Sequence, residues 1–67
     1  MKIRLNNIDE IISIETLTIK ELLGLKNFTF KMLVVKINGT LIRQADYETT
    51  MIKDGDNVVV MHLVSGG

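Results

Sequence analysis

The sequence predicts a small α+β domain in which a mixed five-stranded sheet carries one helix across one face. Three observations support this. The chain has only 67 residues. Short apolar segments rich in β-branched residues end at Asn, Asp and Gly residues that favour turns, and in one segment the apolar residues recur at helical spacing. A chain this short buries only about 60% of its unfolded surface, so nearly every apolar residue must serve the core or a partner. We expect a single domain over residues 1–67.

The chain begins with a predicted hairpin. Residues 1–5 alternate apolar and basic side chains, which is typical of a strand with one buried face. Asn6-Asn7 favours a turn, because asparagine tolerates left-handed backbone angles. Residues 10–14, rich in isoleucine, are predicted to form the second strand.

One helix follows the hairpin. Apolar side chains in residues 19–23 recur at helical spacing. Thr18 and Glu21 fit a capping box, in which the threonine oxygen accepts from a free helical N–H and the glutamate bonds back to the cap residue. We therefore expect the helix to start after Thr18 and to end by Lys26 or Asn27.

A second hairpin is predicted after the helix. Leu33–Ile37 forms its first strand, and Asn38-Gly39 is the dipeptide preferred in two-residue hairpin turns because both residues accept positive φ. The short return strand covers residues 40–43. Residues 46–50 are then predicted to form a helical turn or loop.

The last predicted strand covers residues 57–64 and follows a tight turn at Asp54-Gly55-Asp56. A hairpin, a crossing helix, a second hairpin and a final strand fit the β-grasp arrangement, in which the last strand lies beside the first in the middle of the sheet. Five strands and one helix make two layers, so the second face of the sheet is expected to carry no helix.

The final strand is apolar on both of its faces. Side chains alternate along a strand, so Val58 and Val60 share one face and Val59, Met61 and Leu63 share the other. We predict that Val58 and Val60 point into the core and that the other three residues form a partner-binding surface. The alternatives are the reverse assignment and a second face that is covered by loops.

Composition excludes several classes of function. Eight basic and eight acidic residues cancel, and no basic stripe is visible, so we expect no nucleic-acid partner. Apolar runs are far shorter than the roughly 20 residues that span a bilayer, so we expect no membrane association. Without cysteine, and with one histidine, the sequence predicts no metal site and a reducing, cytoplasmic location. No nucleophile–base pair, phosphate loop or carboxylate dyad indicates an enzyme.

The chain ends in Ser65-Gly66-Gly67, directly after the apolar strand. We predict that residues 65–67 form a flexible tail. Two glycines leave a bare backbone and a terminal carboxylate, which can enter a channel too narrow for a Cβ. The last four residues reach roughly 13 Å when extended. A frayed chain end is the plainer alternative.

Four short motifs together resemble a known family. They are residues 18–23, residues 35–39, residues 54–56 and the terminal Gly66-Gly67, and they occur in the order and spacing of ThiS-type sulfur carriers. The resemblance covers essentially the whole chain. It implies a ubiquitin-like β-grasp fold and a protein that carries sulfur for thiamin biosynthesis.

The resemblance also implies a chemistry for the tail. A ubiquitin-activating-type adenylyltransferase would use ATP to convert the Gly67 carboxylate to an acyl-adenylate. A sulfur donor such as a desulfurase persulfide would then leave a thiocarboxylate, whose sulfur goes to thiazole synthase. Gly66 would give access, Ser65 would act as a hinge, and the final strand would dock. The carrier would be a co-substrate with no bound cofactor.

The sequence also allows other functions for a protein of this kind. The small subunit of molybdopterin synthase and the carriers for tRNA thiolation use the same terminal chemistry. A β-grasp protein-binding module without terminal chemistry is an alternative of a different class. Family members commonly have Val-Pro-Arg after the second hairpin turn, whereas residues 41–44 here read Leu-Ile-Arg-Gln. The sequence therefore does not identify the partner that binds the edge of the sheet formed by this return strand.

Overall fold

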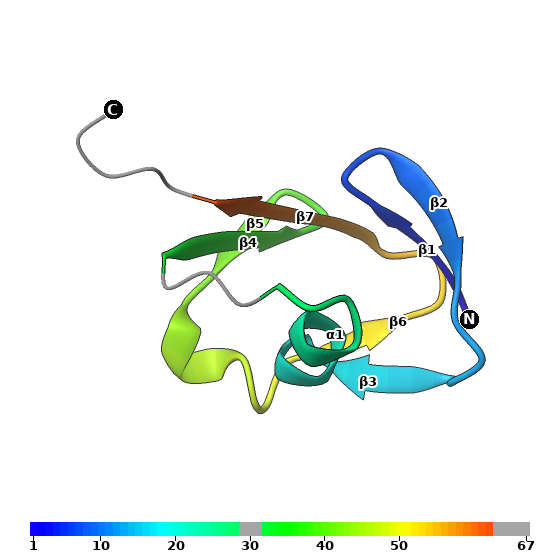
Figure 1. Cartoon of the computed structure of the whole chain (residues 1–67), viewed down its shortest axis with the longest axis horizontal. Coiled ribbons are helices and arrows are strands. Elements are labelled where there is room, and N and C mark those ends of the chain that lie inside the picture. Colours follow the sequence, from blue (N-terminus) through cyan, green and yellow to red (C-terminus); the bar gives the residue numbers. More distant parts are fainter. Residues whose placement is uncertain (29–31, 63–67) are drawn as a thin grey trace.

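The computed structural model describes residues 1–28 and 32–62. Figure 1 shows a five-stranded sheet above a layer that contains the helix and a small second sheet. In chain order the elements are β1 (Lys2–Leu5), β2 (Ile8–Ile11), β3 (Thr16–Thr18), α1 (Ile19–Leu25), β4 (Leu33–Ile37), β5 (Thr40–Ile42), the 3-10 turn η1 (Gln44–Asp46), β6 (Met51–Lys53) and β7 (Asn57–His62).

The five-stranded sheet has the predicted β-grasp order. Its strands lie in the sequence β2-β1-β7-β4-β5, so the last strand lies in the middle, next to the first. β1 and β7 are parallel, and the other neighbouring pairs are antiparallel. The mixed sheet with one helix across one face, as predicted from the sequence, is confirmed.

The structure contains a second sheet that the sequence did not predict. β3 and β6 pair antiparallel and place Leu17 opposite Ile52, both fully buried. Each strand has three residues, which is too short for an alternating pattern to be recognised. The predicted helical turn over residues 46–50 begins earlier, as η1 over Gln44–Asp46.

The predicted position of the second strand was wrong. β2 spans Ile8–Ile11 rather than residues 10–14. Asn6 and Asn7 both adopt positive φ, 51° and 67°, so the turn needs only these two residues and Ile8 pairs directly with Leu5. The turn signal was therefore correct, but the strand starts immediately after it. The return strand β5 ends one residue earlier than predicted, because Arg43 occupies the position directly before η1.

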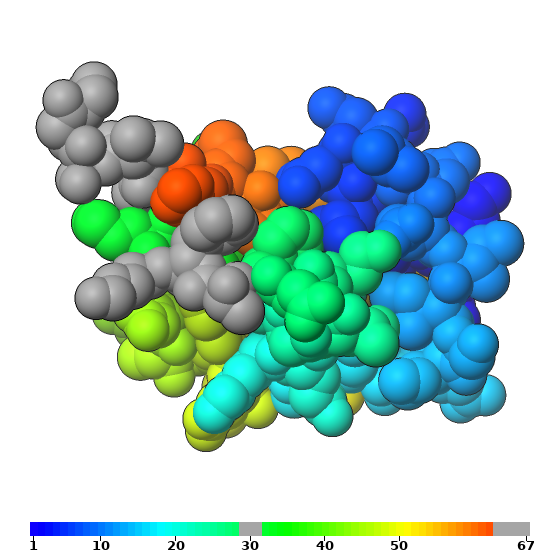
Figure 2. Space-filling view, viewed as in Figure 1, coloured from blue at the N-terminus to red at the C-terminus, as the bar shows by residue number. Residues whose placement is uncertain are grey.

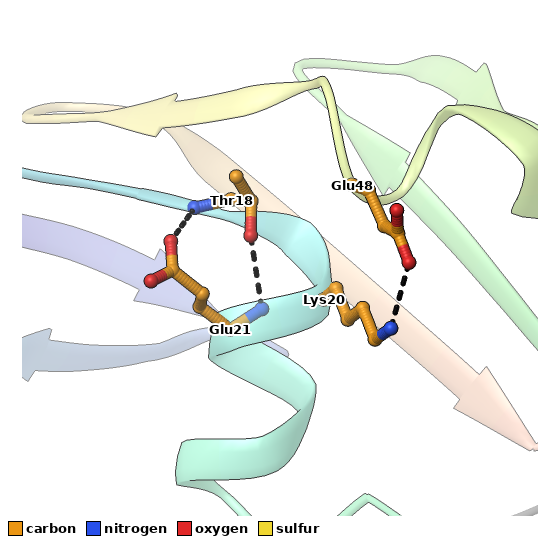
Figure 3. A network of polar contacts seen from close by, with 4 residues as sticks. All are labelled: Thr18, Lys20, Glu21 and Glu48. Atoms are coloured by element: carbon orange, nitrogen blue, oxygen red, sulfur yellow. Dashed lines mark hydrogen bonds and ion pairs between the residues drawn. The ribbon is translucent and has the colours of Figure 1, made fainter.

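Helix α1 starts as predicted. The Glu21 backbone N–H donates to Thr18 Oγ1 at 3.1 Å, and the Thr18 N–H donates to Glu21 Oε1 at 2.8 Å (Figure 3). This reciprocal pair is the predicted capping box. The helix ends at Leu25 with Lys26 as its C-cap, and Asn27 follows with φ of 58°. The expectation that the helix ends by Lys26 or Asn27 is confirmed.

The core lies between α1, the small sheet and the inner face of the large sheet. Val58 and Val60 of β7 point into it, with 0% and 6% of their surface exposed. Burial of apolar side chains is the main stabilising contribution in a domain of this size. The buried side chains are Ile3, Leu5, Ile12, Leu17, Ile19, Leu22, Leu23, Val35, Tyr47, Ile52, Val58 and Val60.

Candidate docking face and chain end

The tail predicted to carry the chemistry falls beyond the part of the chain that the structure describes. β7 is described over Asn57–His62. The predicted continuation of this strand to residue 64 and the residues Leu63, Ser65, Gly66 and Gly67 all lie outside the described residues. Their roles in docking, access and modification therefore stay predictions. The described structure instead shows the strand that leads into this segment.

β7 presents different faces to the core and to solvent. Val58 and Val60 are buried, whereas Met61 is 44% exposed and Val59 is half-buried. The predicted assignment of Val59 and Met61 to the outer face is confirmed for these two residues, and the reverse assignment is wrong. That the outer face binds a partner stays a prediction.

Neighbouring strands extend this apolar surface. In the antiparallel pairing of β4 with β7, Val34 lies opposite Met61 and Lys36 lies opposite Val59. Leu41 of β5 lies opposite Lys36 in turn. Directly opposite residues share a face. We call the outward-facing set of Val34, Leu41, Val59 and Met61 the docking face.

Sequence reasoning missed Val34 and Leu41. Leu33, Val34 and Val35 are consecutive apolar residues, and such a run indicates a strand with apolar residues on both faces. The sequence therefore indicated an apolar outer face on this strand. Only the register between β4 and β7, however, shows that Val34 lies beside Met61. Leu41 is 58% exposed, and its place on the same face follows only from its pairing with Lys36.

The docking face is open because the second layer lies on the other side of the sheet. Figure 1 shows α1, β3 and β6 together beneath the five-stranded sheet, with none of the described helices above it. In the space-filling view, β7 atoms in orange reach the surface between the blue N-terminal hairpin and the green β4 strand (Figure 2). Partly exposed apolar side chains grouped in this way are typical of a protein-binding surface.

The comparisons with known proteins agree with this architecture. The model of the ThiS family matches residues 4–67, which is nearly the whole chain. The chain belongs to the ThiS family. The family match includes the β7 strand and the terminal residues Ser65, Gly66 and Gly67, so the resemblance expected from the four motifs is confirmed.

Two solved structures are similar to this ThiS-family chain. The crystal structure of the thiamine biosynthesis protein ThiS from Geobacter metallireducens superposes with a TM-score of 0.87 at 29% identity, covering 100% of both chains. The solution structure of a thiamine biosynthesis protein from the same organism gives a TM-score of 0.77 at 29% identity, covering 100% of this chain and 88% of that one. A comparison with curated protein sequences gave no match.

The electrostatic contacts that perturb titration in this ThiS-family domain lie away from the docking face. Lys20 Nζ lies 2.7 Å from Glu48 Oε1 (Figure 3). The hydrogen bond between them, helped by their charges, raises the pKa of Lys20 and lowers the pKa of Glu48. Burial raises the pKa of Tyr47, whose ring belongs to the core. These contacts join α1 to the segment after η1 and indicate a structural role.

Within residues 1–28 and 32–62, no three His, Cys, Asp or Glu side chains are grouped closely enough to hold a metal ion. The helix in the same ranges lacks the length and apolar character needed to cross a bilayer.

Proposed function

We propose that this chain is a sulfur carrier of thiamin biosynthesis and that the sulfur travels as a thiocarboxylate on Gly67. The observation that carries the proposal is the ThiS-family match, which continues through the terminal glycines. Both similar structures are proteins of thiamine biosynthesis, and their likeness to this chain spans its full length.

In the proposed reaction, the Gly67 carboxylate attacks the α-phosphorus of ATP in the active site of a ubiquitin-activating-type adenylyltransferase. A carboxylate–phosphorus bond forms and pyrophosphate leaves. A free carboxylate is a poor acylating group, whereas its mixed anhydride with AMP reacts readily with nucleophiles. ATP is thus a substrate of the partner enzyme, and this chain contributes the carboxylate.

Sulfur transfer follows activation. The terminal sulfur of a desulfurase persulfide attacks the Gly67 carbonyl carbon, and AMP leaves. A thiol of the activating system then cleaves the resulting acyl disulfide, so that a protein disulfide forms and a thiocarboxylate stays on Gly67. The chain itself has no cysteine, so the sulfur cannot be carried as a side-chain persulfide on this protein. Thiazole synthase is the proposed acceptor.

The described fold suits a carrier of this kind. β7 pairs with β1 at Asn57 and Val58 and with β4 from Val58 to His62, so the strand that precedes the tail is fixed in the sheet up to His62. Gly66 and Gly67 lack Cβ atoms and would pass a narrow channel where other residues clash. The docking face on β7, β4 and β5 would bind the enzyme while the tail enters its active site.

The thiazole pathway is favoured over molybdopterin synthesis and tRNA thiolation by the family match and by the names of both similar structures. A binding module without terminal chemistry has no comparable support. We accordingly propose that the chain is a protein co-substrate rather than an enzyme.

The proposal is tested by ATP–pyrophosphate exchange with the adenylyltransferase encoded in the same genome. We expect the native chain to support exchange. A variant with one alanine added after Gly67 should not, because the added Cβ and the displaced carboxylate no longer fit. Equal exchange with both proteins, with the extension shown to be intact, would refute a reaction at Gly67.

A further inference from the structure

The outer face of the five-stranded sheet carries an excess of positive charge. Because the buried residues of each strand point inward, the alternating positions Lys2, Arg4 and Lys36 face outward. Asp9, opposite Arg4 on β2, is the acidic residue that the strand register places on this face. The whole chain has equal numbers of acidic and basic residues, so this face differs from the rest of the surface.

Two of these cations lack a partner within the described structure. Lys2 Nζ lies 4.0 Å from Asp9 Oδ2 and is partly compensated. Arg4 and Lys36 are exposed, and neither side chain forms an ion pair with any residue of 1–28 or 32–62. On other parts of the surface the ion pairs are Lys20–Glu48, Lys26–Glu10 and Arg43–Asp46.

The two unpaired cations adjoin the docking face. Lys36 lies opposite Val59 on one side and opposite Leu41 on the other, so its stem lies among the apolar side chains. Arg4 lies opposite Asn57, which precedes Val59 by two residues and shares its face. Long basic side chains pack their apolar stems along such a surface and keep their charges in water.

We propose that the docking face binds a protein surface that is largely apolar and carries carboxylates opposite Arg4 and Lys36. The inference rests on the proposed function and assigns this surface to the adenylyltransferase, because β7 forms the docking face and leads directly towards Gly67. The proposed complementarity joins apolar contact with opposite charges, and it gives the carrier a means of selecting its enzyme.

A protein fits this face better than a nucleic acid. Four apolar side chains lie on both sides of Lys36 and beyond it, whereas nucleic-acid sites present a broad basic patch or stripe. Apolar side chains combined with a few charged residues are typical of a protein–protein contact. The charges are exposed, so they act mainly on the rate of association and on partner choice, and salt screens them.

The test measures association of the full-length chain with that adenylyltransferase by stopped-flow fluorescence over a range of salt concentrations. The test variant is Arg4→Glu/Lys36→Glu. The control is Lys53→Glu, because Lys53 is exposed on β6, in the layer on the other side of the sheet, and also lacks an ion pair within the described residues. Circular dichroism confirms that all the proteins are folded.

We expect the double variant to associate about tenfold more slowly at low ionic strength, with the difference shrinking as salt is added. Lys53→Glu should stay within about twofold of the native rate, because its charge lies away from the contact. A double variant that associates at the native rate at every salt concentration would overturn the inference. So would tighter binding of bulk tRNA than of the enzyme by the native chain.

Sulfur loading separates this inference from the proposed function. If the native chain acquires sulfur at its terminus while the double variant binds normally, the charge inference fails and the carrier function stands. If saturating enzyme never adenylates the native chain, the proposed function itself fails.

Discussion

The side-chain oxygen of Asn6 accepts a hydrogen bond from the backbone N–H of Val60 at 2.8 Å. This contact joins the β1–β2 turn to the middle of β7, beyond the last parallel pair, Leu5 with Val58. The Asn6 side chain thus satisfies a partly buried backbone donor that β1 can no longer reach. It fixes the strand that bears the docking face against the N-terminal hairpin.

Asn6→Gly should destabilise the domain. Glycine keeps the positive φ of 51° but removes the acceptor, and leaving a partly buried N–H unsatisfied costs about 1–3 kcal/mol. The matched control is Asn7→Gly. Its φ is also positive, and glycine is preferred at the second turn position, so stability should stay equal or rise by less than about 1 kcal/mol. Urea unfolding of both variants measures the difference, and equal losses would contradict the role of the hydrogen bond.

Thr18→Ala should weaken the start of α1. It removes the oxygen that accepts from the Glu21 N–H, and loss of such a cap typically costs about 1 kcal/mol. Thr18→Ser keeps the acceptor and should retain most of the stability. The urea midpoint reports the change, with the slope expected to stay constant. A serine variant as unstable as the alanine variant would show that the threonine methyl group, not the cap, is what matters.

Met61→Asp should separate binding from folding. Met61 is 44% exposed, so a carboxylate there stays hydrated and the fold should lose less than about 1 kcal/mol. Placed in a docked apolar surface, the same charge should weaken binding of the adenylyltransferase by about tenfold or more. Val60→Asp buries its charge and should unfold the domain. Native-like enzyme affinity in the Met61→Asp variant would rule out the docking face as the contact.

Lys20→Met should raise the pKa of Glu48 towards its ordinary value. The hydrogen bond with Lys20 lowers that pKa in the folded protein, so the contact stabilises the fold above the ordinary glutamate pKa of 4.5 and is lost as pH falls through the lowered value. Both side chains are exposed, so the effect on stability should be small and salt-sensitive. An NMR titration of the Glu48 carboxyl group measures the shift, and Lys53→Met should leave it unchanged. An identical Glu48 titration after Lys20→Met would contradict the pairing.

Local patterns in the sequence were sufficient for most of the large sheet and for the helix. The Asn38-Gly39 turn is an example, because both residues have positive φ, 51° and 85°, as a two-residue hairpin turn requires. Thr18 and Glu21 likewise signalled the helix start through contacts only three residues apart. Signals of this range are present in the sequence itself.

Features that depend on distant residues could not be predicted in this way. The short strands β3 and β6 pair across more than thirty positions, as Thr18 with Met51 shows, and no local pattern reports that contact. The same limit applies to the docking face, where the apolar strand indicated Val59 and Met61 but only the register added Val34 and Leu41. The position of the Lys36 charge within the docking face also follows from that register.

The central claim is that Gly67 carries the sulfur. Its most direct test is intact-mass spectrometry of the native chain after incubation with ATP, the adenylyltransferase and a desulfurase with its cysteine substrate, followed by fragmentation of the C-terminal peptide. We expect a mass increase equal to the replacement of one oxygen by sulfur, located on Gly67. An unchanged mass with a demonstrably active enzyme, or sulfur located on any other residue, would contradict it.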